Sequence, residues 1–175
     1  MFLKRLTKPG AAKAAAQRLY AATVAQARAP ALYAELGAPD TPDGRFEVYT
    51  LLVLLVLERL RALGDAGLAQ GYFDTYLSGL DNGLRELAVG DLSVGKTMRR
   101  LGEAFYGRGK ALDEALAALP DRAPLEALVA RTLFAGAEGS DPAPFAARLI
   151  ALRESLCAAP GPALSAGELP WASAA

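Results

Sequence analysis

The sequence predicts an all-α protein that folds as a single compact domain of about seven or eight helices, with no sheet. Alanine and leucine dominate the chain, whereas isoleucine occurs only at Ile150 and the valines are scattered. With 53% hydrophobic and 22% charged residues, the 175-residue chain has the composition of a globular domain with its own core. Glycine and proline interrupt the helical patterns at stretches such as APDTPDG, residues 38–44.

These interruptions and the apolar spacing between them place the helices. A long first helix is followed by a short one that has proline in its first turn. The third helix ends at Gly64-Asp65, which supplies a C-cap for it and an N-cap for the fourth. The fifth begins at Asp91 or Ser93 and weakens at Gly107 and Gly109. The expected ranges are 11–29, 30–36, 45–63, 66–87, then the fifth helix, and finally 112–119, 124–134 and 142–157.

The predicted domain covers residues 10–158, between a basic N-terminal segment (1–9) and a tail (159–175). The tail contains three prolines and many small residues, so we expect it to be poorly ordered. The N-terminus carries no acidic residue before Glu35. This composition is typical of a mitochondrial transit peptide, and equally of an ordinary basic first helix. No apolar run approaches the ~20 residues of a membrane-spanning helix, and no secretory signal is recognisable.

The charged and reactive residues restrict the possible functions. Lys plus Arg and Asp plus Glu both number 19, so the net charge gives no general attraction to nucleic acid or anionic membrane. Histidine is absent, which removes the commonest general base and metal ligand. The single cysteine, Cys157, is expected to be a small buried hydrophobe and not a nucleophile. We therefore expect no catalytic residue, no metal and no cofactor.

One stretch imitates a nucleotide site. GDLSVGKT, residues 90–97, fits the phosphate-loop pattern G-x-x-x-x-G-K-[ST]. A phosphate loop follows a buried strand, however, and the residues before Gly90 have helical spacing. We therefore interpret Gly90 as the end of one helix and Asp91 or Ser93 as the cap of the next. A nucleotide-binding enzyme stays the third hypothesis.

Helical periodicity separates polar from apolar faces on the fourth and fifth helices. Each polar face is by default a solvated surface. Alternatively, the fourth helix carries an acidic docking stripe, and the fifth carries a basic face for RNA, lipid headgroups or an acidic partner. The apolar faces contain Leu68, Tyr72, Phe73, Tyr76, Leu80 and Leu84 on the fourth helix and Val94, Met98, Leu101 and Phe105 on the fifth. The polar faces contain Asp74, Ser78, Asp81 and Arg85 on the fourth and Lys96, Arg99, Arg100 and Glu103 on the fifth.

The third helix is apolar over most of its circumference. Leu54 falls among polar residues on the helical wheel, with Leu51 and Leu55 beside them. Either the helix is buried on several sides, or these leucines form an exposed patch of the kind that binds a partner. If the patch is exposed, Leu54→Asp leaves folding intact and weakens partner binding.

Two segments of the chain carry recognisable motifs: PDTPDGRFEVYTLLVLLVLERLR (39–61) and QGYFDTYLSGLDNGLRELAVGDLSVGKTMRRLGEAFYGR (70–108). Both resemble the ubiquinol–cytochrome c chaperone family, the assembly factors of respiratory complex III. The resemblance covers about half the chain and includes DGRFE, the spaced aspartates after Phe73, VGDL-x-VGK and FYGR. It implies an all-helical, non-enzymatic protein that binds newly made cytochrome b. It also implies peripheral contact with the cytoplasmic face of a bacterial inner membrane and, as in mitochondrial relatives, a ribosome or a small partner subunit nearby.

The resemblance also favours partner binding at the positions that match its motifs. Those positions are Asp74, Asp81, Arg85, Asp91, Lys96, Tyr106 and Arg108, and the client surface would add Leu51, Leu54 and Leu55. Capture of a client helix in a groove would suit this role. The alternative is a helical adaptor that binds ribosome or RNA through the basic face of Lys96, Arg99 and Arg100.

Overall fold

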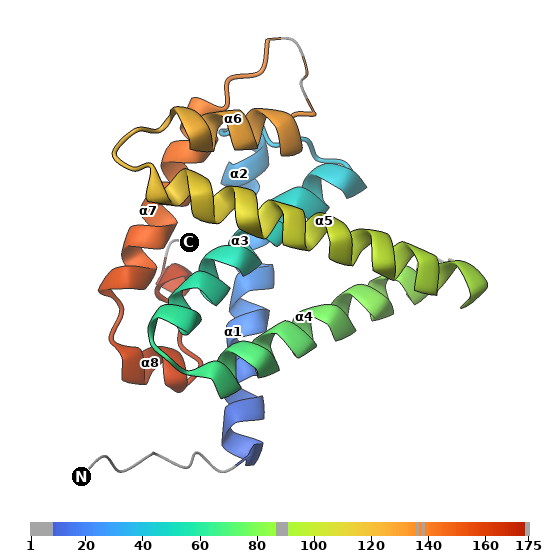
Figure 1. Cartoon of the computed structure of the whole chain (residues 1–175), viewed down its shortest axis with the longest axis vertical. Coiled ribbons are helices and arrows are strands. Elements are labelled where there is room, and N and C mark those ends of the chain that lie inside the picture. The colour runs from blue at the N-terminus through green and yellow to red at the C-terminus, as the bar shows by residue number, and fades with distance from the viewer. Residues whose placement is uncertain (1–8, 87–90, 136, 138, 174–175) are drawn as a thin grey trace.

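The computed structural model describes residues 9–86, 91–135, 137 and 139–173, and within these ranges the side chains of residues 9, 86, 91–94, 96, 172 and 173 are not described. The predicted all-α fold is confirmed, and the described residues contain helices and no strand (Figure 1). In chain order the elements are α1 (Pro9–Ala27), α2 (Pro30–Ala34), α3 (Pro42–Ala62), α4 (Ala66–Glu86), α5 (Asp91–Ala117), α6 (Ala123–Thr132), α7 (Ala143–Ala158), α8 (Gly161–Ser165) and a 3₁₀ turn, η1 (Pro170–Ser173).

Helix α3 lies at the centre of the packing. It contacts α1, α4, α5 and α7, which together surround it. This environment explains why α3 is apolar nearly all round, since a helix covered on several sides buries several faces. Between Glu47 and Leu57 every residue except the half-buried Tyr49 is buried, including Leu51 and Leu55 at 0% exposure and Leu54 at 5%. The exposed leucine patch is therefore wrong, and these three leucines belong to the core.

The turn between α3 and α4 has the predicted chemistry. Gly64 adopts a positive φ of 74°, the left-handed conformation that glycine reaches without steric cost. Asp65 Oδ1 accepts a hydrogen bond from the Leu68 backbone N–H at 3.0 Å, which caps α4. Helix α4 then packs along α1 and α3 with Leu68, Tyr72 and Tyr76 buried, as its spacing predicts.

Helix α5 differs from the prediction because it continues through Gly107 and Gly109 to Ala117 and includes the helix expected at 112–119. A Cβ at Gly109 would lie 3.2 Å from Leu54 Cδ2, so glycine allows α5 to pass close over α3. The intrinsic cost of glycine in a helix, about 1 kcal/mol, is offset by the buried side chains of Phe105 and Leu112.

The predicted disordered tail is also wrong. Leu164, Leu169 and Trp171 are buried, and the Trp171 indole N–H donates to Leu152 O at 3.1 Å. Two arginine side chains satisfy carbonyls of this segment: Arg18 Nη2 donates to Ala166 O at 2.6 Å and Arg59 Nη2 to Ala159 O at 3.2 Å. Long-range burial and side-chain caps order a stretch whose composition alone indicates a flexible tail.

Cys157 does not follow the prediction either, because it is exposed on α7. Its neighbours along the same helix, Leu152 and Leu156, face the core instead. Among the described helices, none combines the length and apolarity that crossing a lipid bilayer requires.

Candidate functional site

The segment DGRFE forms the start of α3 and is built around one close approach. Thr41 caps the helix by accepting a hydrogen bond from Gly44 N at 3.1 Å. A Cβ at Gly44 would lie 2.1 Å from Pro39 O, so only glycine fits here. Arg45 pairs with Asp40 at 2.5 Å and lies 5.5 Å from the centre of the Tyr33 ring. This motif therefore fixes the entry of the chain into α3.

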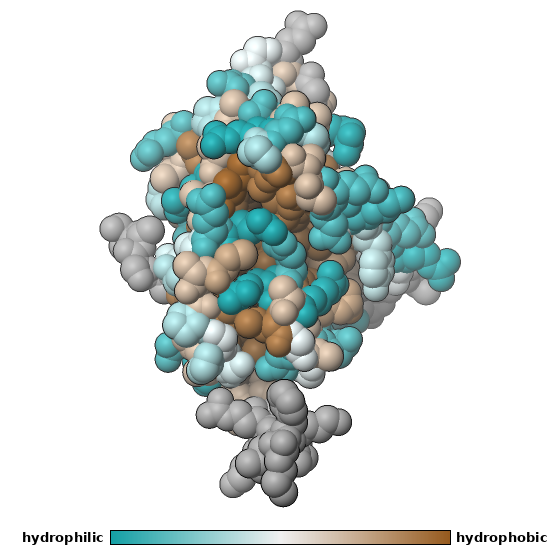
Figure 2. Space-filling model, turned by 60° about the vertical axis from the view of Figure 1, so that its left-hand side comes forward, coloured by the Kyte–Doolittle hydropathy of each residue, from teal (hydrophilic) through white to brown (hydrophobic). Residues whose placement is uncertain are grey.

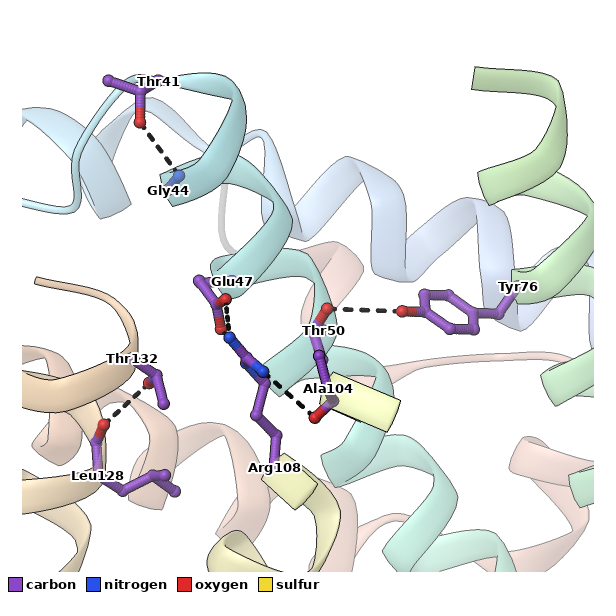
Figure 3. A network of polar contacts seen from close by, with 9 residues as sticks. All are labelled: Thr41, Gly44, Glu47, Thr50, Tyr76, Ala104, Arg108, Leu128 and Thr132. Carbon is purple, nitrogen blue, oxygen red and sulfur yellow. Dashed lines mark hydrogen bonds and ion pairs between the residues drawn. The ribbon is translucent and has the colours of Figure 1, made fainter. Parts of the chain in front are cut away.

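The two signature segments meet in an ion pair between Glu47 of DGRFE and Arg108 of FYGR (Figure 3). Arg108 Nε and Nη2 both donate to the Glu47 carboxylate, and Nη1 donates to Ala104 O at 3.2 Å. Glu47 is buried and Arg108 half-buried, so the pair is largely removed from water. Arg108, predicted as a partner-binding residue, thus has an intramolecular partner that fastens α5 to α3.

A chain of aromatic rings leads from the core to the surface beside this pair. Tyr49, Tyr76 and Phe105 follow one another with centroid separations of 5.2 and 5.1 Å, and Phe73 lies 5.3 Å from Phe105. Burial raises the pKa of the Tyr76 phenol to about 12. The Tyr76 hydroxyl lies 3.5 Å from Thr50 Oγ1, at the long limit of a hydrogen bond (Figure 3).

Tyr106 ends the chain of rings at the surface. Its ring meets Phe105 edge-on at 6.1 Å, yet 68% of the residue is exposed. Of the large hydrophobic side chains in the described residues, only that of Tyr106 is exposed. An exposed aromatic supported by a buried one is typical of a partner-binding residue. Tyr106 is thus the predicted partner-binding residue whose surroundings best suit that role.

Two adjoining cavities lie on either side of Tyr106. The first, of about 280 Å³, is enclosed by Leu57 and Arg61 of α3, Ala69 and Phe73 of α4, and Phe105 and Tyr106 of α5, among others. The second, of about 330 Å³, shares Arg61, Phe105 and Tyr106 and continues along α5 past Leu54, Gly109 and Lys110. We call the two together the Tyr106 groove.

Helices α4 and α5 diverge from the right-hand edge of Figure 1. The groove lies where these two helices meet α3. On the face drawn in Figure 2, apolar residues lie in hollows between hydrophilic ones.

A third cavity, of about 370 Å³, separates α5 from α6. It is bordered by Arg108 and Ala111 of α5 and by Leu128, Arg131 and Thr132 of α6. Figure 3 shows Leu128 and Thr132 on the side of Arg108 away from Tyr76, and the Thr132 hydroxyl donates to Leu128 O at 2.8 Å. This cavity has no aromatic wall, so it offers less apolar contact than the Tyr106 groove.

The predicted polar residues are spread over separate surfaces. Asp74 is exposed and accepts a hydrogen bond from Gln70 Nε2 at 2.7 Å. Asp81 pairs with Arg85 at 2.8 Å within α4. Arg99 and Arg100 are exposed on α5. The hydrogen bond of Asp74 and the ion pair of Asp81 both stay within α4, whereas Arg108 pairs with Glu47 of α3.

Asp91 and Lys96 belong to α5, but their side chains fall outside the described part of the structure, as does Gly90. The false phosphate loop is nonetheless explained for the rest of its length, because residues 91–97 are helical and α4 precedes them. The sheet that a phosphate loop requires is not found among the described residues. Within that same part of the chain, no group of three acidic, cysteine or histidine side chains is placed to hold a metal ion.

Sequence reasoning missed two residues of the site. Glu47 is one of the polar residues around Leu54 on the helical wheel of α3, and only the position of α5 over α3 reveals its role as the partner of Arg108. Arg61 is another of these polar residues, and it borders both cavities of the Tyr106 groove. The one available signal was spacing: Leu54, Leu57 and Arg61 fall at i, i+3 and i+7 on α3, which places them on one helical face.

Comparison with known proteins agrees with this architecture. Residues 34–171 match the family described as Ubiquinol-cytochrome C chaperone, which is most of the chain. The chain therefore belongs to the ubiquinol–cytochrome c chaperone family. It is also similar to a crystal structure described as the Cbp3 homolog from Brucella abortus, with 35% sequence identity and a TM-score of 0.81 over 93% of this chain and 91% of that one. No curated protein matches the sequence significantly.

Proposed function

We propose that the protein is a non-enzymatic assembly chaperone that binds newly made cytochrome b and supports assembly of ubiquinol–cytochrome c reductase. The family match over residues 34–171 carries the proposal. The likeness to the Cbp3 homolog from Brucella abortus, which extends over nearly the whole chain, supports it. We propose further that the protein works at the cytoplasmic face of a bacterial inner membrane, in peripheral contact with it, where a membrane-protein client would emerge.

The Tyr106 groove supports the proposal physically. A chaperone of this kind has to cover apolar client surface until the client reaches its own partners. The groove combines aromatic walls at Phe73 and Phe105 with the exposed ring of Tyr106. Aromatic side chains supply large contact area and dominate binding energy in protein interfaces. The mechanism is therefore binding, with Tyr106 contributing to client affinity.

The test is association with cytochrome b in the native membrane. The tagged protein would be isolated from gently solubilised membranes, and co-purified cytochrome b would be measured by mass spectrometry and by its haem absorbance. Deletion of the gene should lower cytochrome b and the activity of ubiquinol–cytochrome c reductase. Unchanged cytochrome b in the deletion strain, together with its absence from the purified protein, would contradict the proposal.

A second candidate is a helical adaptor that binds ribosome or RNA through the basic face of α5. The exposure of Arg99 and Arg100 favours it. The test is co-sedimentation with ribosomes across a salt series for the double substitution Arg99→Glu and Arg100→Glu. Loss of sedimentation with cytochrome b binding intact would favour the adaptor. A small partner subunit, which the same purification would reveal, is compatible with either function.

A further inference from the structure

Arg61 is placed differently from several other arginines whose side chains the structure describes. Several of them donate to an oxygen of the protein itself: Arg18 and Arg59 to carbonyls of the C-terminal segment, Arg108 to Glu47 and Arg153 to Glu58. Arg61 is exposed, and its guanidinium has no hydrogen bond or ion pair to the described residues. It nevertheless borders both cavities of the Tyr106 groove.

The surroundings of Arg61 in the first cavity are mostly apolar. Arg61 is the charged residue of this lining, which contains Leu57, Ala69, Phe73 and Phe105 and, as a neutral polar side chain, Gln70. A helix laid against these walls would exclude water from the guanidinium. A guanidinium removed from water requires an anionic or carbonyl partner, because an unpaired buried charge is strongly destabilising. The occupant of the groove must therefore bring an acceptor to this point.

The shape of the groove suits a helix. Tyr106 borders both of its cavities, and side chains on successive turns of a helix, i and i+4, lie about 5–6 Å apart, so a helix can offer one side chain to each cavity. The side chains of Ala66 and Ala69 on α4 are small, so a bound helix can approach this side of the groove closely. The second cavity is bordered by Asp113, Glu114 and Lys110, and Lys110 pairs with Glu114 at 3.8 Å, so its charges are already balanced, whereas Arg61 is the charged residue of the first cavity. The acceptor is therefore expected beside the first cavity.

We propose that the Tyr106 groove binds an apolar client helix that carries one carboxylate, and that Arg61 pairs with this carboxylate. The inference rests on the proposed chaperone function and specifies the segment of client that is recognised. Tyr106, Phe73 and Phe105 supply apolar contact, which contributes equally to the binding of any apolar helix. Arg61 supplies the selectivity, because a guanidinium forms two parallel hydrogen bonds with a carboxylate and not with an amide.

The test compares two fluorescent helical peptides made of Leu and Ala with flanking Lys residues. One peptide carries a single Glu at its centre and the other carries Gln at that place. Binding to the full chain is followed by fluorescence anisotropy at constant salt. We expect the wild-type protein to bind the Glu peptide at least about tenfold more tightly than the Gln peptide, as a charge-assisted pair shielded from water implies. Arg61→Gln should bring this ratio to within about twofold.

Two further variants make the test specific. Arg131→Gln removes another exposed arginine, which borders the cavity between α5 and α6, and should leave the ratio as in the wild type. Tyr106→Ser should weaken the binding of both peptides by the same factor, because it removes apolar contact with each of them. A ratio near one in the wild type, or an undiminished ratio in Arg61→Gln, overturns the inference. So does binding that Tyr106→Ser leaves unchanged.

Sedimentation of the protein alone tests a second copy of this chain as the occupant. A dimer that Arg61→Gln or Tyr106→Ser dissociates would overturn the inference, whereas a monomer supports it. The purification of cytochrome b keeps the two proposals separate. Cytochrome b that co-purifies equally with wild type and Arg61→Gln, together with a peptide ratio of one, refutes the inference and leaves the chaperone function standing. Loss of cytochrome b from Arg61→Gln but not from Arg131→Gln supports the inference.

Discussion

Helices α3 and α5 carry parts of the two signature segments and cross one another, but their surroundings differ. Helix α3 is enclosed by four other helices, and its residues from Glu47 to Leu57 are buried except for the half-buried Tyr49. Helix α5 buries Phe105 and Leu112 on one face and exposes Arg99, Arg100 and Tyr106 on the other. A motif on α3 is therefore explained by packing, whereas a motif on α5 contains residues that the fold itself does not require. Substitutions that affect folding or binding separately can test this difference.

The largest effect is expected from Leu54→Asp. Leu54 is buried under α5, with its Cδ2 3.2 Å from the place of a Cβ on Gly109, so the substitution removes packed apolar contact and puts a carboxylate, largely out of water, at the wall of the second cavity. We expect a loss of about 4 kcal/mol or more in the free energy of unfolding. Urea unfolding followed by circular dichroism measures it. A surface substitution that costs ~0.5 kcal/mol lowers the melting temperature by roughly 2 °C. A melting temperature of the Leu54→Asp variant within that range of the wild type would support the exposed leucine patch instead.

Trp171→Ala tests whether the C-terminal segment belongs to the enclosed part of the molecule. The substitution removes a ring that is 4% exposed and its hydrogen bond to Leu152 O. We expect a loss of about 3 kcal/mol. Glu168→Ala, an exposed change three residues earlier, is the control and should stay within about 0.5 kcal/mol. Equal unfolding curves for the two variants would show that the segment adds nothing to stability.

Glu47→Ala probes the connection between α3 and α5. It leaves the half-buried Arg108 guanidinium without its carboxylate, and we expect a loss of about 2–3 kcal/mol, below the value for a fully buried pair because Arg108 keeps some contact with water. The double substitution with Arg108→Ala should cost less than the sum of the single ones. Additive losses in this thermodynamic cycle would mean that the two side chains act independently.

A smaller effect separates two tyrosines whose hydroxyl groups are buried. The Tyr72 hydroxyl donates to Thr23 Oγ1 at 2.8 Å, since the Thr23 proton is used on Leu19 O, whereas the Tyr49 hydroxyl interacts with the Tyr20 phenol but makes no hydrogen bond of ordinary geometry within the described part of the chain. Tyr72→Phe should cost about 1 kcal/mol, and Tyr49→Phe should be neutral or stabilising by up to about 1 kcal/mol. Thermal unfolding of both variants measures the contrast, and a larger loss for Tyr49→Phe would reverse it.

The smallest effect on stability is expected from Tyr106→Ser. Because most of this side chain is in solvent, the free energy of unfolding should change by less than about 0.5 kcal/mol. Recovery of cytochrome b with the tagged protein should fall severalfold, as for an aromatic interface residue. Tyr33→Phe, which loses only the hydrogen bond to Ala27 O on another side of the molecule, should retain full recovery. Equal recovery of cytochrome b with both variants would show that Tyr106 is not part of the surface that binds the client.

Much of the fold could be predicted from the sequence because its signals are local. Gly64 and Asp65 define a turn and a cap by their own conformational preferences, and the spacing of Leu68, Tyr72 and Tyr76 identifies the buried face of α4. The scarcity of β-branched residues predicted the absence of strands that the described residues confirm. The resemblance in two segments predicted the family to which the chain belongs.

The sequence by itself determined the helical class, most of the turns and the family. Only the tertiary structure decided that Leu51, Leu54 and Leu55 are core, that α5 continues through Gly109, and that Trp171 orders the C-terminal segment. It also decided that Glu47 meets Arg108 and that Arg61 reaches the Tyr106 groove. The physical reason is that capping and propensity act within a few residues of the chain, whereas burial and charge pairing depend on which helices lie against each other.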